Sequence, residues 1–400
     1  MEEMPALHRR TGRAARLRRW VARHRFRSVL VVLAVLVTPV LWSLGWALTD
    51  PSMGSSLAGR MAEWARQHGA GGVVVWAENT WYSHHPPPVG GKPGKGALPA
   101  TRSAAGDPPP SSVPPHLAAP SPMALVAQPP MAGEGQWRPV GRLVGGVPAV
   151  YETFVRPDSV HTSVVTGVAW MDTKLLSATL YSGSKIPGGG PWKNTAPVSP
   201  QAADSLVAAF NAGFLMSNAN GGYYTQGTTV DPLRTGAASF VIYRDGTATV
   251  GQWGRDVSMT PNVVAVRQNL DLLVDGGQPV AGLNANDTTR WGYTLGNQVY
   301  VWRSGVGVTA DGALVYAAGP NLNIVDLANV LARAGAVRAM ELDINTDWVN
   351  FTSYAPTTST APAAAANGTT LLPTMSGGPG RYFESWWDRD FFTMSARPGT

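Results

Sequence analysis

The sequence predicts an α+β domain with a large mixed β-sheet and few helices, preceded by one transmembrane helix and a disordered proline-rich linker. Three observations lead to this prediction. Apolar runs of strand length recur between residues 149 and 317. The pairs Asp245-Gly246 and Asp311-Gly312 each separate two such runs, which is a strong hairpin signal. Helical periodicity is clear at 324–334, but such signals are few.

The expected strands share a short apolar or alternating pattern between turn residues. They are 149–155, 164–171, 175–181, 206–211, 237–243, 247–251, 263–266, 270–274, 300–303, 306–309 and 313–317. A short helix is expected after Ser199, with Pro200 at its first helical position. A second helix is expected at 324–334, where Asn323 caps the start. The run 337–347 then follows as a buried strand with a polar end.

Composition excludes several classes of function. The chain has 400 residues and no cysteine, which excludes disulfides, thiolate metal sites and cysteine nucleophiles. Its net charge of +6 originates at the N-terminus, because residues 1–27 carry nine arginines and two glutamates. The remaining chain is therefore close to neutral, and we expect no nucleic-acid partner.

The N-terminal part of the sequence predicts a membrane-anchored protein. Residues 28–48 contain no charged residue, and a helix of this length spans about 30 Å, the thickness of the bilayer core. The arginines of residues 1–27 favour a cytoplasmic tail, so we expect a single-pass cell-membrane protein with an extracytoplasmic C-terminal domain. A cleaved signal peptide is the alternative. Residues 49–82 are expected as a juxtamembrane segment, 83–135 as a Pro/Gly/Ala-rich linker, and 136–400 as the folded domain.

Two carboxylates near the end of the run 337–347 are the first candidates for chemistry. In a strand, Glu341 and Asp343 point to the same face, with Cα atoms about 6.6 Å apart. Burying two carboxylates without partners is costly, which suggests a functional site. The alternative is a structural ion pair with Arg303 or Arg338.

Further polar or glycine residues follow the ends of apolar runs. Asn211 and Gly213 come directly after one of these runs. Gly221 and Gly222 belong to a glycine-rich loop, which permits close backbone approach to a ligand. Asp275 ends another apolar run. Each position taken alone favours a turn.

Taken together, these elements resemble the phosphodiester glycosidase family. Asn211-Ala-Gly-Phe-Leu215 is similar to the family's Asn-Gly-Gly-Phe-Phe element, and Arg303-Ser-Gly-Val-Gly307 matches its Arg-Ser/Thr-Ala-x-Gly segment. Gly335-Ala336 and Ala339-Met-Glu-Leu-Asp343 match a helix end followed by the family's Ala-x-x-Leu-Asp strand. Residues 344–347 depart from the family, which has a glycine run there. The chain resembles an actinobacterial-type, membrane-anchored branch.

The resemblance implies a hydrolase that cleaves a sugar-1-phosphodiester at the anomeric carbon. Phosphate is already a good leaving group, so a strong general acid is less necessary than in other glycosidases. Arg303 is then expected to bind the phosphate through its guanidinium group. Asp343 is the first choice for the carboxylate that attacks the sugar or activates water, and Glu341 is the second.

Substrate contacts are expected from amides, glycines and an aromatic residue near these groups. The expected positions are Asn211, Gly213, Gly221, Gly222, Asp275, Asn345 and Trp348. No metal or other cofactor is expected to be required, and Ca²⁺ is at most an incidental ligand. The expected partner is an N-acetylglucosamine-type sugar phosphodiester or a related cell-envelope glycan. The alternative is a non-catalytic module that binds cell-envelope glycan on the same scaffold.

Overall fold

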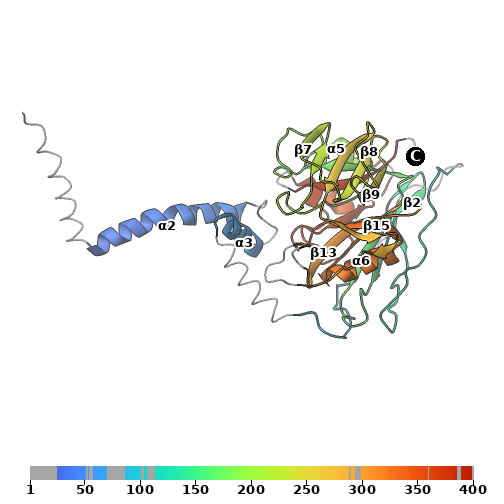
Figure 1. The fold of residues 1–400 in the computed structure, drawn as a ribbon, viewed down its shortest axis with the longest axis horizontal. Helices are drawn as coiled ribbons and strands as arrows, with labels where there is room; N and C mark the ends of the chain where they lie inside the picture. The colour runs from blue at the N-terminus through green and yellow to red at the C-terminus, as the bar shows by residue number, and fades with distance from the viewer. Residues whose placement is uncertain are drawn as a thin grey trace, which may run out of the picture. The chain divides into compact units, whose positions relative to one another are not determined.

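The computed structural model describes most of the chain, and the fold below concerns these residues. They are 25–50, 53, 57–69, 86–100, 103–105, 113–287, 290–292, 299–358, 360–384 and 389–398. The chain divides into two compact units, Met1–Gly69 and Ala70–Thr400 (Figure 1). Each unit is described by itself.

The first unit contains two helices, α2 (Arg25–Thr49) and α3 (Leu57–Gln67). The segment Val29–Thr49 of α2 has a mean hydropathy of 2.3 and is long and apolar enough to cross a membrane. α3 packs back against the C-terminal part of α2. Trp64 Nε1 donates a hydrogen bond to Ser43 Oγ at 3.0 Å, which joins the two helices.

The second unit is dominated by an eight-stranded sheet. Its strands, in spatial order, are β1 (Arg138–Val144), β2 (Val147–Val155), β3 (Thr166–Met171), β14 (Leu314–Leu322), β13 (Val301–Thr309), β15 (Ala336–Glu341), β11 (Leu272–Asp275) and β12 (Gln278–Pro279). All of the ladders between these strands are antiparallel. The β13–β15 register places Glu341 opposite Gly305.

One face of this sheet is covered by α6 (Ile324–Arg333). Asn323 caps the helix, because its Oδ1 accepts a hydrogen bond from Asp326 N at 2.9 Å. A Cβ atom at Gly305 in β13 would lie 2.9 Å from Leu331 Cδ1. The glycine therefore allows the helix to approach the sheet closely.

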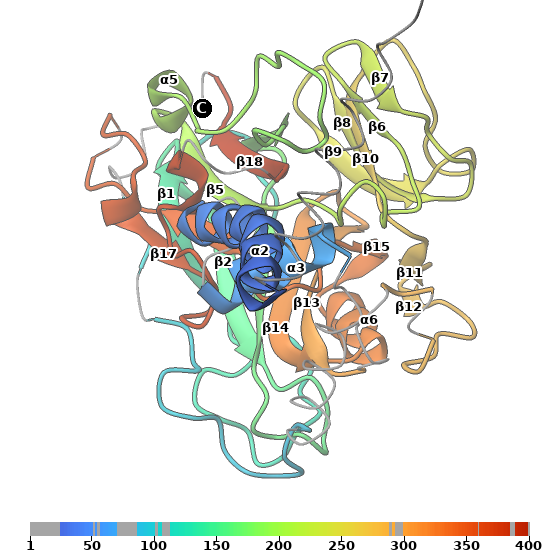
Figure 2. The same cartoon turned by 90° about the vertical axis from the view of Figure 1, so that its left-hand side faces the viewer.

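Two five-stranded antiparallel sheets complete the unit (Figure 2). One has the order β7 (Thr228–Asp231), β6 (Tyr223–Thr225), β10 (Val263–Gln268), β8 (Ala238–Tyr243) and β9 (Ala248–Gln252). The other has the order β17 (Gly368–Thr370), β16 (Phe351–Tyr354), β5 (Leu206–Asn211), β18 (Phe391–Ala396) and β4 (Leu176–Tyr181). The short helix α5 (Pro200–Ala203) precedes β5 and is capped by Ser199.

Aromatic packing joins the three sheets into one core. Phe210 of β5 has its ring centroid 5.4 Å from that of Tyr316 in β14 and 6.3 Å from that of Phe240 in β8. Phe392 of β18 packs on both phenylalanines, at 5.3 and 4.2 Å. All four rings are buried. Their burial and edge or tilted contacts stabilise the arrangement of the sheets.

The predicted fold class is confirmed, with differences in detail. The second unit is an α+β domain with many strands and few helices, and both expected helices form. Each expected strand overlaps an observed one, but 300–303 and 306–309 belong to the single strand β13, and the strand expected at 337–347 ends at Glu341. The described strands form three antiparallel sheets, however, where the sequence suggested one mixed sheet. The strands that pattern reading missed are β1, β6, β7, β12, β16, β17 and β18.

Part of the segment expected to be a solvated linker packs on the folded unit. Leu117, Met123 and Ala127 are buried. Leu117 N donates a hydrogen bond to Asp172 Oδ2 at 2.7 Å, and Glu134 forms a buried ion pair with Arg156 at 2.9 Å. The described residues 113–135 are therefore part of the folded unit. A proline-rich segment cannot order itself, but a few apolar side chains suffice when a sheet supplies their partners.

Candidate active site

The polar end of β15 is held by Ser304 of the neighbouring strand β13. β15 ends at Glu341, not at residue 347 as the sequence suggested. Beyond it, Leu342 N donates to Ser304 O at 2.8 Å, and Asp343 O accepts from Ser304 N at 2.8 Å. Asp343 N also donates to Ser304 Oγ at 3.1 Å. The backbone of Asp343 is therefore fixed although the residue lies outside the strand.

Arg303 and Glu341 form an ion pair inside the protein. Arg303 Nη1 lies 2.6 Å from Glu341 Oε1, and the two side chains are 1% and 0% exposed. Nη1 also donates to the backbone carbonyl of Trp291, while Nε and Nη2 donate to those of Leu322 and Val299. The guanidinium group is thus occupied by the protein. The prediction that Arg303 grips a phosphate disagrees with this geometry, which matches the alternative of a structural bridge.

Glu341 is less suited to catalysis than the sequence suggested. Burial raises the pKa of its carboxyl, and the neighbouring charge of Arg303 opposes that rise. Its Oε2 atom is buried without a hydrogen-bond partner. A fully enclosed carboxyl with one oxygen paired to Arg303 has no direct access to a substrate.

Asp343 has one carboxylate oxygen engaged and one available. Oδ1 accepts hydrogen bonds from Ile344 N at 2.7 Å and from Asn345 N at 2.9 Å. Oδ2 accepts no hydrogen bond from any described residue, and the residue is 5% exposed. Burial raises the pKa of Asp343 to about 6, while the charge of Arg389 lowers it and that of Asp390 raises it.

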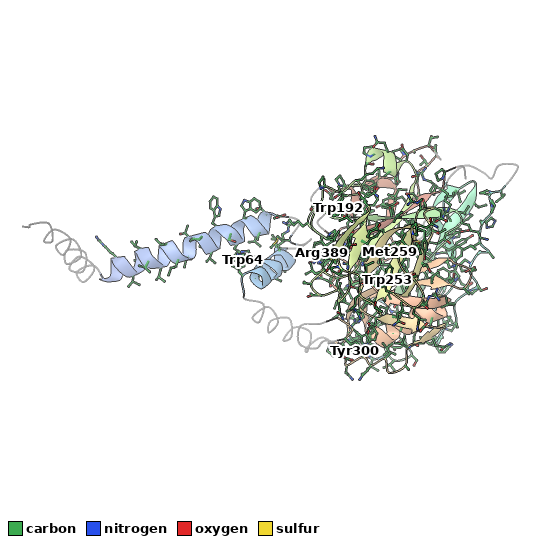
Figure 3. All side chains as sticks on the ribbon, turned by 45° about the horizontal axis from the view of Figure 1, so that its top comes forward. Trp64, Trp192, Trp253, Met259, Tyr300 and Arg389 are labelled. Atoms are coloured by element: carbon green, nitrogen blue, oxygen red, sulfur yellow. The ribbon has the colours of Figure 1, made fainter. Side chains whose placement is uncertain are left out.

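Arg389 is a cation that the sequence reading missed. It lies two residues before β18, is 8% exposed, and is labelled in Figure 3. Its Cζ lies 4.4 Å from the ring centroid of Trp348, a cation–π contact that holds the side chain. The guanidinium group donates no hydrogen bond to the described residues. Within the described part of the chain, no hydrogen bond occupies the Arg389 guanidinium, in contrast to that of Arg303, and its charge acts on Asp343.

A second buried ion pair lies next to Arg389. Arg267 Nε is 2.6 Å from Asp390 Oδ2, and both side chains are fully buried. Arg267 also donates to the backbone carbonyls of Gln268 and Phe214. Burial raises the pKa of Asp390, while Arg267 lowers it. The pair fixes the start of β18 against β10 and thereby fixes Arg389.

Asn269 connects the loop after β5 with the end of β15. Its Nδ2 donates to the backbone carbonyls of Glu341 and Leu342 at 2.9 and 3.0 Å. Its Oδ1 accepts from Phe214 N at 3.1 Å. Asn269 is buried and directly follows β10. Asn269 is not among the residues predicted from the sequence. The one feature of the sequence that could have indicated it is an amide side chain at the end of an apolar run.

Asn211 supports the site from within the core. Its Oδ1 accepts hydrogen bonds from Tyr316 Oη at 2.8 Å and Asn350 N at 3.2 Å. Its Nδ2 donates to Ser304 Oγ at 3.1 Å and to Ala212 O at 2.9 Å. The amide is buried and its hydrogen-bonding capacity is used. Asn211 therefore positions Ser304, where the sequence suggested a sugar contact.

The three glycines expected to contact substrate are required by internal packing. A Cβ atom at Gly213 would lie 3.0 Å from Asn269 Oδ1, and one at Gly221 would lie 2.6 Å from Gln268 Cβ. One at Gly222 would collide with the carbonyl of Pro232. These contacts explain why glycine is required at each of the three positions, without a contact to a ligand.

The remaining predicted residues divide between two places. Asn345 belongs to the turn after Asp343, where its Oδ1 accepts from Asp347 N at 2.9 Å. Trp348 is brought to the site by its contact with Arg389. Asp275 does not lie at the site. Its Oδ2 lies 2.7 Å from Arg255 Nη1 at the half-exposed end of β11. No group of three His, Asp or Glu residues suited to a metal ion occurs in the described part of the chain.

Comparison with known families places the region around Asp343 among hydrolases that cleave glycosidic bonds. Residues 204–343 match the family model of phosphodiester glycosidases. The match spans Asn211, Arg303 and Asp343, so the resemblance seen in the sequence is confirmed at the level of the family. No curated protein gives a match.

Two solved structures are similar to the chain. The first is the catalytic domain of zebrafish N-acetylglucosamine-1-phosphodiester alpha-N-acetylglucosaminidase, with a TM-score of 0.39, 14% identity, and coverage of 64% of this chain and 87% of that one. The second is a hypothetical protein from Synechocystis, with a TM-score of 0.34, 13% identity, and coverage of 65% of this chain and 64% of that one.

Proposed function

We propose that the chain hydrolyses a sugar-1-phosphodiester of the N-acetylglucosamine type, or a related cell-envelope glycan bond, at a site formed by Asp343 and Arg389. One observation carries the proposal. Asp343 Oδ2 and the Arg389 guanidinium are nearly buried charged groups that interact electrostatically, yet neither has a hydrogen-bond partner among the described residues. An anionic ester beside a carboxylate is the ligand that this arrangement suits.

The expected mechanism divides the work between the two side chains. Arg389 binds the phosphate oxygens, for which a planar guanidinium offers paired donors. The bond between the anomeric carbon and the phosphate oxygen breaks, and its electron pair leaves with the phosphate. Asp343 either attacks the anomeric carbon to form a glycosyl ester, which water then hydrolyses to release the sugar and free the carboxylate, or removes a proton from the water that attacks this carbon directly. Its pKa of about 6 leaves it ionised at neutral pH, as both roles require.

The residues that surround this pair hold it in place. Ser304 fixes the backbone of Asp343, and Trp348 supports the guanidinium of Arg389. The buried Arg303–Glu341 and Arg267–Asp390 pairs hold the ends of β15 and β18. Such support matters because catalytic groups act only when they are held within a fraction of an ångström of the productive geometry.

Turnover of an activated N-acetylglucosamine-1-phosphodiester by the full chain in detergent tests the proposal. Asp343→Asn should lower kcat/KM at least 100-fold, because the asparagine Oδ1 keeps the two backbone hydrogen bonds but loses the charge. Asp275→Asn is the matched control and should retain activity. Absence of turnover by the wild type, with glycan binding retained, would support the non-catalytic module instead.

The membrane attachment is part of the same proposal. α2 is the one described helix long and apolar enough to span a bilayer, and the arginines before it favour a cytoplasmic N-terminus. We therefore infer an uncleaved, single-pass signal anchor with an extracytoplasmic catalytic domain, as in a membrane-anchored, actinobacterial-type branch. Protease digestion of intact cells should remove the C-terminal unit and leave a protected N-terminal fragment. A mature chain that lacks residues 28–48 would support a cleaved signal peptide.

A further inference from the structure

A groove outside the candidate active site lies between two sheets. It has a volume of about 400 Å³ and is lined by β4, by the turn between β8 and β9, and by β10. This volume lies within the range typical of small-ligand sites. Arg244 and Asp245 are the charged residues of the lining, so their charges cancel. The groove therefore suits an uncharged ligand.

One wall of the groove is β4, the edge strand of its sheet. Its outer edge is tied to the protein at two points, because Ala178 N donates to Gly246 O at 2.8 Å and Ser182 N donates to Asn194 O at 3.0 Å. Strand geometry directs the N–H and C=O of Leu180 to the same side. No described residue bonds to this backbone unit, which lines the groove.

The Leu180 backbone is a single position with a free N–H and C=O on this edge, and this favours a sugar over an extended peptide as the ligand. An extended peptide that adds a strand to a sheet needs several consecutive backbone positions. Here the positions on both sides of Leu180 are closed by Gly246 and Asn194. A sugar needs only isolated donors and acceptors, which the Leu180 backbone supplies.

The other lining groups include side-chain amides and an aromatic ring, which can contact a sugar. Gln226 Oε1 accepts from Lys193 N at 2.8 Å, which fixes the amide and leaves its NH₂ group available. Asn194 adds a second amide, and Tyr243 adds an aromatic ring. Val264 is the extra residue of a β-bulge in β10 and lies in the lining, and bulges often reshape a strand beside a binding site.

Contacts between neighbouring residues also link the wall of the groove to the start of β18. Tyr181, at the end of β4, pairs with Phe391, which follows Arg389 and Asp390. Ser182 Oγ lies 3.2 Å from Tyr223 Oη, whose ring contacts Arg267. A strand advances about 3.3 Å per residue, so Leu180 is roughly 10 Å along the chain direction from the level of Arg389. A glycan of a few sugars covers such a distance.

We propose that the groove between β4 and the β8–β9 turn binds a neutral oligosaccharide, held by the Leu180 backbone and the amides of Asn194 and Gln226. This inference rests on the proposed function in one respect, because the bound glycan is then the extended part of the phosphodiester substrate. It names the substrate class as an oligosaccharide, where the Asp343 site alone specifies only one sugar and a phosphate.

Calorimetric binding of an N-acetylglucosamine tetrasaccharide to the full chain in detergent tests this inference. Asn194→Ala combined with Gln226→Ala should weaken binding at least 10-fold. Thr179→Trp, which fills the groove from β4, should do the same. The matched control combines Gln201→Ala with Asn329→Ala, two exposed amides outside the groove, and should bind as the wild type does.

The outcomes separate this inference from the proposed function. The tetrasaccharide carries no phosphodiester, so the wild type should bind it whether or not it turns over a phosphodiester. Unchanged binding in both groove variants, or no binding by the wild type, would overturn the inference. So would binding of an extended Thr-Val hexapeptide in place of the tetrasaccharide. Thermal unfolding followed by circular dichroism verifies that the variants are folded.

Discussion

Arg303 Nη1 lies 2.6 Å from Glu341 Oε1 inside the protein, where neither side chain is more than 1% exposed. The pair joins β13 to β15 directly before Asp343. Removing one partner leaves the other charge buried, which typically costs about 3–5 kcal/mol. We therefore expect Arg303→Met to lower the free energy of unfolding by about this amount in urea denaturation of the full chain.

The control for this prediction is the exposed pair of Arg255 and Asp275. Solvent-exposed ion pairs contribute about 0–1 kcal/mol, so Arg255→Met should change the free energy of unfolding little. If Arg303→Met were as stable as Arg255→Met, with lower affinity for the phosphodiester, Arg303 would be a ligand residue as the sequence first suggested.

Local patterns were sufficient to predict the strands and helices that contain the site. The helix Ile324–Arg333 has a side-chain cap, an apolar stripe and a terminal glycine within a few residues, and each signal is local. Asp343 is a candidate from the sequence alone because a carboxylate at the end of an apolar run is costly to bury without a partner. The same cost of burial makes Glu341 a candidate. The sequence does not show which of the two carboxylates pairs with an arginine.

The rest of the site depends on contacts between distant segments. Arg389 reaches Asp343 because β18 pairs with β5 in a sheet other than that of β15. No local signal specifies this pairing, and Arg389 lies within the aromatic-rich stretch 382–392. The sequence predicts ligand contacts at the three glycines 213, 221 and 222 because a local pattern does not show which side chains face them.

A substitution at Gly221 tests whether this glycine is required by internal packing or by contact with a ligand. An added Cβ would lie 2.6 Å from Gln268 Cβ, well inside van der Waals contact. Overpacking of this kind costs about 1–3 kcal/mol, so Gly221→Ala should lower the midpoint of urea unfolding. Gly94→Ala is the control, because no atom lies within 4 Å of its added Cβ. A Gly221→Ala protein with normal stability and impaired substrate binding would show that packing is not the reason for this glycine.

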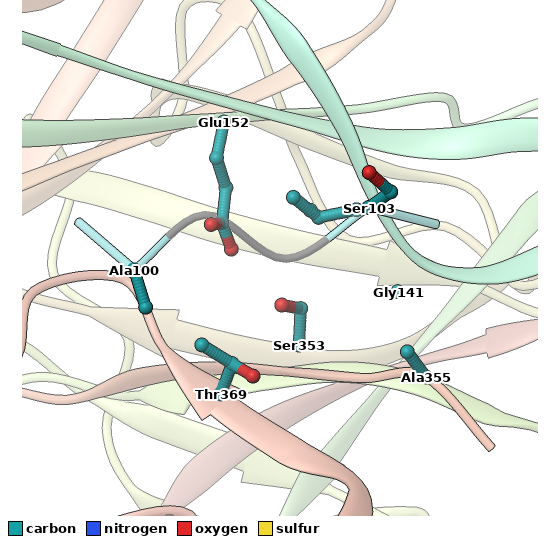
Figure 4. A pocket seen from close by; sticks show the side chains of 8 residues that line it. Ala100, Ser103, Gly141, Glu152, Ser353, Ala355 and Thr369 are labelled. Atoms are coloured by element: carbon teal, nitrogen blue, oxygen red, sulfur yellow. The ribbon is translucent and has the colours of Figure 1, made fainter. Parts of the chain in front are cut away.

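Glu152 predicts a dependence of stability on pH. Its carboxyl is buried in a small cavity and points toward Ser353 (Figure 4). Burial raises its pKa to about 7, above the value of the unfolded chain, while a hydrogen bond with Ser353 lowers it. The folded state therefore binds this proton more tightly, so stability decreases as pH rises from about 4.5 to 7.

Glu152→Gln should remove this contribution. One proton changes the free energy of unfolding by up to about 1.4 kcal/mol per pH unit, so the variant should have the flatter profile between pH 5 and 7. Urea denaturation at several pH values measures the difference. Parallel profiles for variant and wild type would mean that Glu152 has an ordinary pKa in the folded protein.

The pH dependence of turnover tests the pairing of Asp343 with Arg389. Ionised Asp343 is the active form, and its pKa is about 6, so kcat/KM should fall about tenfold per pH unit below 6. The positive charge of Arg389 lowers this pKa, so Arg389→Met should move the acid limb to higher pH as well as reduce the rate. Arg389→Lys keeps the charge and should leave the limb near 6, with a lower rate because paired donors are lost. An acid limb at the same pH in the methionine and lysine variants would mean that Arg389 does not act on the catalytic carboxylate.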